Sequence, residues 1–217
     1  MSTGLKKGVV TISASETALH LLLLPVLRMY KKSFPDIRIR ILNHLSGQAI
    51  ESVKNGLADF AVVAAHTEIE KPLLSYPVME FKDILIGGPA YSFLKNILVS
   101  IKELRNYPLV CLAENTMSYA FYNDFYRLHH LVLKPELEAA TTDQILPIIK
   151  NDLGIGFIPE VFAKEALEAN EVCKITLSEE IPARQIYFVE NENCPLSVAA
   201  KELKKLLLQY PQRHRQE

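Results

Sequence analysis

The sequence has little net charge, no long apolar run and no export signal. Its 24 Lys and Arg residues nearly balance 25 Asp and Glu residues, which leaves a formal net charge of −1. Such a chain has no general attraction for a phosphate backbone, so we do not expect it to bind DNA by itself. There is no basic-then-apolar leader, and no apolar run approaches the ~20 residues of a membrane span. We therefore expect a cytoplasmic protein that does not insert into a membrane.

The common catalytic and metal-binding motifs are also missing. The three cysteines, Cys111, Cys173 and Cys194, are far apart and show neither a CxxC pair nor zinc-site spacing. The histidines form no HxxxH or HExxH pattern, and no GxSxG turn is present. The GIG at 154–156 lacks the third glycine of a phosphate loop. We expect no metal site, no cofactor and no enzymatic activity.

The sequence does have enough apolar residues for a packed core. Of its 217 residues, 49% are hydrophobic, which suits one large domain or two small ones. A β-rich run, Val9 to Ser13, is followed by a long apolar-periodic segment and a second β-rich run, Ile37 to Leu42. This order predicts a strand, a helix and a strand, the unit that builds parallel sheets.

Hydroxyl side chains gather where the first strand gives way to its helix. Ser13, Ser15 and Thr17 alternate along this junction. One interpretation is a site for a small polar ligand, because open α/β folds bind ligands at the carboxyl edge of the sheet and at helix N-termini. The other is plain N-capping, in which one hydroxyl satisfies one free N–H group. Capping needs only one of the three, which favours ligand contact.

Four stretches of the chain together resemble a known family. They are GVVTISAS at 8–15, LLPVLRMYKKSFPDIRIRI at 23–41, GLADFAVVAA at 56–65 and TTDQILPIIKNDLGIGFIPE at 141–160. Their order and spacing are similar to those of the effector-binding domain of LysR-type transcriptional regulators, and the resemblance extends from about Leu5 to about Tyr210. It implies a type 2 periplasmic-binding-protein-like α/β fold, with two α/β subdomains joined by two crossover strands and an effector cleft between them.

The sequence pattern places the boundaries of these subdomains. Residues 1–87 plus 185–217 are expected to form regulatory subdomain I, and residues 88–184 regulatory subdomain II. The crossovers are expected near Ile84–Gly88, where Gly87-Gly88-Pro89 interrupts the pattern, and near Arg184–Val189. Pro25 lies inside the first helix and is expected to kink or restart it. Further helices and strands are expected at 47–55, 59–65, 74–89, 101–104, 109–112, 118–130, near 137, and at 143–150, 155–158, 161–169, 185–189 and 197–209.

Two more loops of the first subdomain carry candidate effector-binding residues. Ser46 and Gln48 follow the second strand beside Gly47, which allows close approach of the backbone to a ligand. Capping of the next helix by Ser46 is the equal alternative. His66 follows the third strand, where a solvated loop histidine is the competing interpretation.

The second subdomain contributes the remaining candidates. Asn115 and Thr116 follow a predicted strand, and the resemblance implies that they form part of the cleft wall. Thr142 begins a helix and has capping as an equal alternative, and Pro159 is expected to line the cleft floor through its backbone. Glu114 would repel a carboxylate ligand in the cleft, so it either selects a ligand with an amine or hydroxyl group or points outward.

The resemblance implies a regulatory domain that binds a small-molecule effector and forms a homodimer or tetramer. A winged helix-turn-helix is expected to be absent from this chain, so DNA would be bound only through that missing N-terminal domain. The leucine-rich first helix and the helix Val161 to Ala169 are the expected dimer surfaces. Because some members of the family sense oxidants, a redox pair of Cys173 and Cys194 is an alternative to three structural thiols. A solute-binding protein of a transporter with the same fold is the alternative function. The effector, the target promoter and the sign of regulation do not follow from the sequence.

Overall fold

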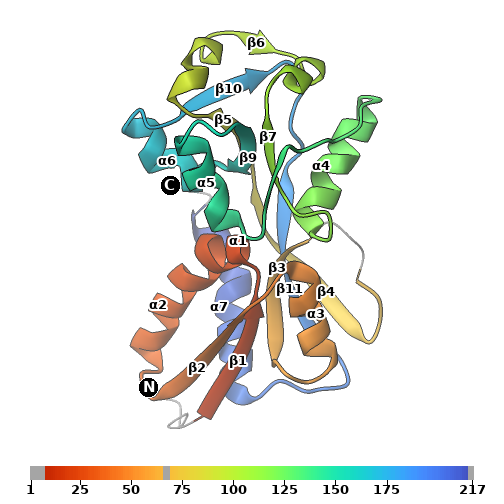
Figure 1. Ribbon diagram of the computed structural model, residues 1–217. Coiled ribbons are helices and arrows are strands. Elements are labelled where there is room, and N and C mark those ends of the chain that lie inside the picture. The colour runs from red at the N-terminus through yellow and green to blue at the C-terminus, as the bar shows by residue number, and fades with distance from the viewer. Residues whose placement is uncertain (1–7, 66–68, 215–217) are drawn as a thin grey trace. The chain divides into compact units, whose positions relative to one another are not determined.

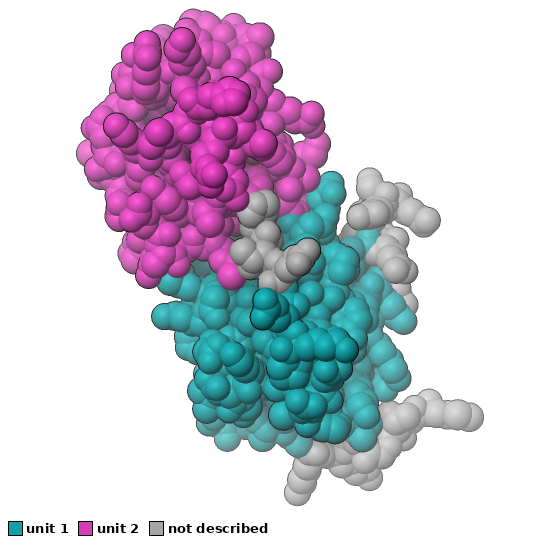
Figure 2. All heavy atoms as spheres, turned by 90° about the vertical axis from the view of Figure 1, so that its right-hand side faces the viewer, with its two compact units in different colours: residues 1–80, 185–217 teal, residues 81–184 magenta. Residues whose placement is uncertain are grey.

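The chain folds into two compact units. The structure, a computed structural model, describes residues 8–65 and 69–214 (Figure 1). Unit 1 comprises residues 1–80 and 185–217, and unit 2 comprises residues 81–184 (Figure 2). The chain therefore passes between the units twice, once after Glu80 and once after Arg184.

Unit 1 is built on a five-stranded sheet with the order β2-β1-β3-β11-β4. Strand β1 pairs in parallel with both β2 and β3, whereas β11 is antiparallel to β3. Because β1, β2 and β3 run the same way, the loops after them leave from one edge of the sheet. The strands are β1 (Gly8–Ala14), β2 (Ile37–Asn43), β3 (Phe60–Ala65), β4 (Leu73–Phe81) and β11 (Arg184–Asn191).

Helices cover this sheet (Figure 1). They are α2 (Leu24–Ser33), α3 (Ser46–Lys54) and α7 (Val198–His214). Helix α3 packs on β1 and β3, and α2 packs on α7, where the Tyr30 hydroxyl donates to the Ala199 carbonyl at 3.0 Å. Strand β3 is covered on both faces, since successive residues Val62 and Val63 are both fully buried. This burial matches the continuous apolar run in the sequence.

The first helix restarts at Pro25. This is one of the two outcomes expected from the sequence, the other being a kink. A short helix α1 (Glu16–Ala18) passes into a π-helical turn η1 (Leu19–Leu23), and α2 begins at Leu24 with Pro25 in its first turn. The Leu24 N–H donates to the Leu19 carbonyl, five residues back. The wider π turn puts the proline where a helix needs no N–H donor, which avoids the cost of a proline in a helix interior.

Unit 2 has its own six-stranded sheet with the order β6-β10-β5-β9-β7-β8. Strand β5 is antiparallel to β9 and β10, and β7 is parallel to β8 and β9. The strands are β5 (Asp83–Gly87), β6 (Leu98–Val99), β7 (Leu109–Leu112), β8 (Leu137–Ala139), β9 (Ile155–Pro159) and β10 (Cys173–Leu177). The helices are η2 (Pro89–Leu94), η3 (Ile101–Asn106), α4 (Met117–Leu128), α5 (Thr142–Lys150) and α6 (Glu160–Glu168).

Two apolar cores lie on the two faces of this second sheet. Leu85 of β5 belongs to the core that contains Phe125 of α4. Its neighbours Ile84 and Ile86 belong to the core that contains Ile149 of α5. This alternation is the period-2 pattern of a strand covered on both sides.

The first expected subdomain boundary was placed too late in the sequence. Residues 81–87 belong to unit 2, because β5 pairs with β9 and β10 in the second sheet. The Gly87-Gly88-Pro89 sequence therefore ends a strand inside unit 2 and does not mark the crossing. The second boundary in the structure lies between Arg184 and Gln185.

The helices and strands expected from the sequence are all present, most of them with shifted ends. Elements β6, β10 and η2 were missed because they are short or carry a weak apolar pattern. Within the described residues, no helix is long and apolar enough to cross a membrane.

Candidate functional site

The hydroxyl groups at the β1–α1 junction are buried and tied to neighbouring strands. Ser13 is fully buried, and its Oγ lies 3.0 Å from His44 Nδ1, just after β2. Ser15 Oγ accepts a hydrogen bond from the Ala64 N–H of β3 at 3.0 Å and makes no side-chain cap to its own helix. Thr17 is also buried. The capping interpretation therefore fails for Ser15, because its hydroxyl joins two strands and leaves the first turn of the helix uncapped by a side chain.

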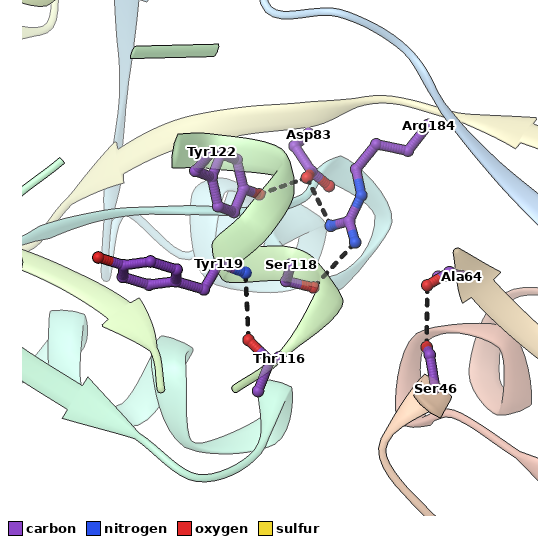
Figure 3. Close-up of polar contacts among 8 residues, drawn as sticks. All are labelled: Ser46, Ala64, Asp83, Thr116, Ser118, Tyr119, Tyr122 and Arg184. Atoms are coloured by element: carbon purple, nitrogen blue, oxygen red, sulfur yellow. Dashed lines mark hydrogen bonds and ion pairs between the residues drawn. The ribbon is translucent and has the colours of Figure 1, made fainter. Parts of the chain in front are cut away.

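The loop after β2 meets the same point of β3. Ser46 Oγ donates to the Ala64 carbonyl at 2.9 Å, as Figure 3 shows. Ala64 of β3 therefore binds both loops, because its N–H donates to Ser15 and its carbonyl accepts from Ser46. The Gln48 side chain accepts from the Leu45 N–H at 3.4 Å and is exposed. Of the first-subdomain candidates, the structure thus gathers Ser13, Ser15, Thr17, Ser46 and Gln48 at the carboxyl edge of β2, β1 and β3. His66 lies outside the described residues.

A similar edge exists within unit 2. Asn115 and Thr116 follow β7, Thr142 follows β8, and Pro159 ends β9. Because β9, β7 and β8 are adjacent and parallel, these candidates share one carboxyl edge. Asn115 is exposed, Thr142 is half-buried and Pro159 is buried.

Thr116 is used as a helix cap. Its Oγ1 accepts from the Tyr119 N–H at 3.1 Å (Figure 3). The same hydroxyl donates to the Ala113 carbonyl at 2.7 Å. Exposed Glu114 accepts from the Tyr119 hydroxyl at 3.3 Å. These hydrogen bonds of Thr116 and Tyr119 fix the start of α4. Asn115, which directly precedes the capping residue, is therefore held in a defined position.

Sequence analysis missed a buried polar cluster beside this turn. Arg184 Nη1 donates to Asp83 Oδ2 at 3.0 Å, and Arg184 Nη2 donates to Ser118 Oγ at 2.8 Å (Figure 3). The Tyr122 hydroxyl also donates to Asp83 Oδ2. The side chains of Arg184 and Asp83 are 7% and 0% exposed. The only sign of this cluster in the sequence was Asp83, which directly precedes the apolar run ILIGG at 84–88. An unpaired charge is unusual beside such a run.

Burial and charge act together on the ionisable groups of this cluster. Burial, and after it the Asp83 carboxylate, raises the pKa of Tyr122 well above its usual range. Burial acts to lower the pKa of Arg184, but the neighbouring Asp83 and Tyr122 together outweigh burial, so the pKa is raised. Arg184 therefore remains a cation at neutral pH, and Tyr122 remains a hydrogen-bond donor.

Within the described part of the chain, no group of three or more His, Cys, Asp or Glu side chains is placed to hold a metal ion. Three free cysteines are present, with Cys111 and Cys173 buried and Cys194 exposed. Burial raises the pKa of Cys111 to about 12, and burial is also the main cause of the raised pKa of Cys173. Both buried thiols are therefore protonated and poorly reactive at neutral pH.

We expect only Cys194 to react rapidly with a thiol reagent such as DTNB in the folded protein. Cys111 and Cys173 should react only after unfolding, because they are buried and protonated. Titration before and after addition of guanidinium measures this difference. The Cys194→Ser variant is the control and should show no rapid reaction. Rapid modification of that variant would contradict the assignment.

The chain is similar to a known protein family along nearly its whole length. The family described as "LysR substrate binding domain" matches residues 3–212. The uncharacterized HTH-type transcriptional regulator YwqM of Bacillus subtilis is 25% identical over 179 residues, which cover 81% of this chain and 60% of that protein. The HTH-type transcriptional regulator CysB of Burkholderia cenocepacia is 25% identical over 155 residues, which cover 71% of this chain and 50% of that protein. The chain thus spans about half the length of these relatives.

Solved structures of similar shape include the effector-binding domain of QuiR in complex with shikimate. It has a TM-score of 0.84 at 17% identity, covering 96% of this chain and 99% of that one. The regulatory domain of CcmR from Synechocystis, in complex with 2-PG, also has a TM-score of 0.84, at 15% identity, covering 95% of this chain and 99% of that one. The likeness establishes the type 2 periplasmic-binding-protein-like α/β fold.

Proposed function

This chain belongs to the LysR substrate-binding-domain family, and from that premise we propose that it senses a small polar effector and thereby controls DNA binding by a domain outside this chain. The observation that carries the proposal is the pair of carboxyl edges, one in each unit, at which neutral hydroxyl and amide groups gather. Ser13, Ser15 and Ser46 supply the first edge, and Asn115 and Thr116 supply the second. Neutral hydrogen-bonding groups suit a ligand rich in hydroxyl or carboxylate oxygens.

The proposed mechanism is a shift between relative orientations of the two units. An effector that contacts both edges binds better to the orientation in which both are within reach, so it increases the population of that orientation. The shift cannot exceed the difference in effector affinity between the two states. In a full-length regulator, that shift would reorient the DNA-binding domains. A cytoplasmic location is part of the same proposal, because promoter DNA lies there.

A transporter's solute-binding protein remains the alternative. The named relatives reported above are transcriptional regulators, which favours the regulatory function. That these relatives are transcriptional regulators also supports a non-enzymatic role for this chain. The reading frame upstream of residue 8 distinguishes the two, because a helix-turn-helix there supports the regulator and a signal peptide the transport protein.

The test of this function is a thermal-shift screen of small hydroxylated acids that includes shikimate and 2-PG. A bound effector at one hundred times its Kd should stabilise the folded chain by about 2.7 kcal/mol. We expect Ser15→Ala to weaken binding of any hit by about 1.5–3 kcal/mol, if its hydroxyl contacts a charged ligand group. Isothermal titration calorimetry measures that change.

The matched control for Ser15→Ala is Ser52→Ala. Ser52 is also a buried serine of unit 1, but its hydroxyl bonds only to the Ala49 carbonyl within α3. The Ser52→Ala variant should have a lower melting temperature but an unchanged affinity for the effector. If Ser15→Ala behaves in the same way, then Ser15 only supports the fold and the proposed edge is not the effector site.

Dimer formation belongs to the same proposal. Of the seven leucine and valine residues of the first helix, five are buried in the chain itself, which leaves Leu24 at 43% exposure and Leu19 half-buried. On α6, Val161 is 58% exposed, and the exposed charged residues are three acids and one base, namely Glu160, Lys164, Glu165 and Glu168. The exposed charged residues on α2 and β2 are all basic, namely Arg28, Lys31, Lys32, Arg38 and Arg40. Apolar contact and opposite charge therefore support pairing of α2 and β2 with α6 of a second copy.

We expect Val161→Asp to weaken self-association by about tenfold or more, because it places a charge in the apolar part of the proposed contact. Light scattering at micromolar concentration should show the mass falling from twice 24.5 kDa toward 24.5 kDa. Val198→Asp is the control, since Val198 is 62% exposed on α7. A parent chain that is already monomeric, or equal effects of both variants, would count against this interface.

A further inference from the structure

The buried cluster around Arg184 lies at the two places where the chain passes between units. Asp83 is the first residue of β5, three residues after the crossing at Glu80. Arg184 is the first residue of β11 and the last residue of unit 2. Their ion pair, with a distance of 3.0 Å between Nη1 and Oδ2, therefore joins two segments that are 101 residues apart in the sequence.

Aromatic rings hold Arg184 in place. Its guanidinium carbon lies 5.1 Å from the centre of the Phe81 ring, 5.0 Å from that of Phe121 and 5.8 Å from that of Tyr122. Phe81 belongs to the first crossing, and Phe121 and Tyr122 belong to α4. Cation–π contacts of this kind restrict a guanidinium group that is otherwise removed from water.

The same guanidinium is bonded to the start of α4. Its Nη2 donates to Ser118 Oγ at 2.8 Å, and Ser118 lies two residues after the capping residue Thr116 (Figure 3). Tyr122, one turn later on α4, donates to Asp83. The helix turn that carries the candidate effector contacts Asn115 and Thr116 is thus attached to both crossings.

The energetics of the cluster favour a positional role. A buried ion pair recovers in attraction about what it loses in hydration, so it adds little net stability over well-packed apolar side chains. Asp83 Oδ1 is moreover buried without a hydrogen-bond partner in the described structure, which leaves part of the carboxylate unsatisfied. The cluster therefore fixes the positions of its side chains, and the unsatisfied oxygen of Asp83 reduces the net stability that the cluster contributes.

We propose that Asp83 and Arg184 are positioning residues that couple the first turn of α4 to both crossings and thereby set the populations of unit orientations. This inference rests on the proposed effector function, because Thr116 and its neighbours are taken as effector contacts. An effector that displaces the start of α4 then acts on both crossings through the guanidinium group of Arg184. Ser118 and Tyr122 complete the connection.

The test measures unit orientation without any ligand, so that it does not depend on the effector site being correct. Spin labels are attached at Lys54→Cys in unit 1 and Lys134→Cys in unit 2, both exposed, in a Cys194→Ser background. The two remaining cysteines are buried. Dilution with unlabelled chain removes signals between copies. Pulsed electron spin resonance then gives the distribution of distances between the two labels.

We expect Ser118→Ala, which keeps the ion pair and removes only the bond to α4, to change the ratio of the distance populations by about tenfold. Asp83→Asn should change it at least as much if that variant folds. Ile175→Val is the matched control, because it mildly destabilises the buried core of unit 2 and leaves every polar group of the cluster in place. An unchanged distribution in Ser118→Ala, or the same change in Ile175→Val, would overturn the proposal. Failure of the ligand screen alone would leave this result intact and refute only the effector function.

Discussion

Asp83→Asn is expected to lower the free energy of unfolding by about 3–5 kcal/mol, the usual cost of leaving one member of a buried ion pair without its partner. The asparagine keeps the shape of the side chain and can still accept from Tyr122. It removes the charge that faces the Arg184 guanidinium, whose side chain is only 7% exposed. Urea unfolding followed by far-UV circular dichroism measures the change.

The exposed ion pair between Lys174 and Glu160 is the control for this prediction. Its nitrogen–oxygen distance is 2.9 Å, but both side chains are about half exposed. Lys174→Met should therefore cost no more than about 1 kcal/mol. If the two variants are equally stable, then burial does not govern the strength of the Asp83–Arg184 pair.

Gly88→Ala is expected to destabilise unit 2 by about 3 kcal/mol or more, because the added methyl group has no space. A Cβ atom at this position would lie 2.3 Å from the Ile149 carbonyl oxygen and 2.4 Å from Asp152 Oδ1. The carbonyl belongs to the backbone of α5, so it cannot turn aside as a flexible side chain can. Asp152 also accepts a hydrogen bond from the Ala90 N–H at 2.8 Å, and that contact would be lost.

Gly47→Ala is the matched substitution at an open position. Apart from its chain neighbours and its own helix backbone, no heavy atom of the described residues lies within 4 Å of a Cβ added at Gly47, which is in the first turn of α3. It should be neutral or stabilise by up to about 1 kcal/mol, since alanine favours helix more than glycine does. A comparison of urea midpoints separates the two glycines. Similar midpoints would show that the segment at Gly88 can move to accept a side chain.

Much of the fold could be predicted from the sequence because its apolar pattern is local. Strand β7 was placed with its exact ends, and β3, which is buried on both faces, carries the continuous apolar run typical of such a strand. Ends of helices were less well placed, since capping depends on contacts beyond the periodic residues. The boundary between the units was misplaced by seven residues, because a glycine pair can end a strand as readily as it can mark a crossing.

The candidate effector residues could be proposed from position alone. A polar residue after a parallel strand lies at the carboxyl edge whatever it contacts, which is why Ser15 and Ser46 were found. Their actual partner, Ala64, could not be inferred, because a hydrogen bond between distant loops leaves no periodic signal. His44 was missed for the same reason, although it contacts Ser13.

The sequence by itself determined the family, the α/β class and the order of strands and helices, since these follow from local patterns that neighbouring residues repeat. Only the tertiary structure decided which polar groups meet. It placed Arg184 against Asp83 and Ser118, and it bonded Ser15 to a strand, where the sequence had offered a ligand contact or a helix cap. The physical reason is that these contacts join residues 49 to 101 positions apart, whose proximity is set by packing of the whole unit.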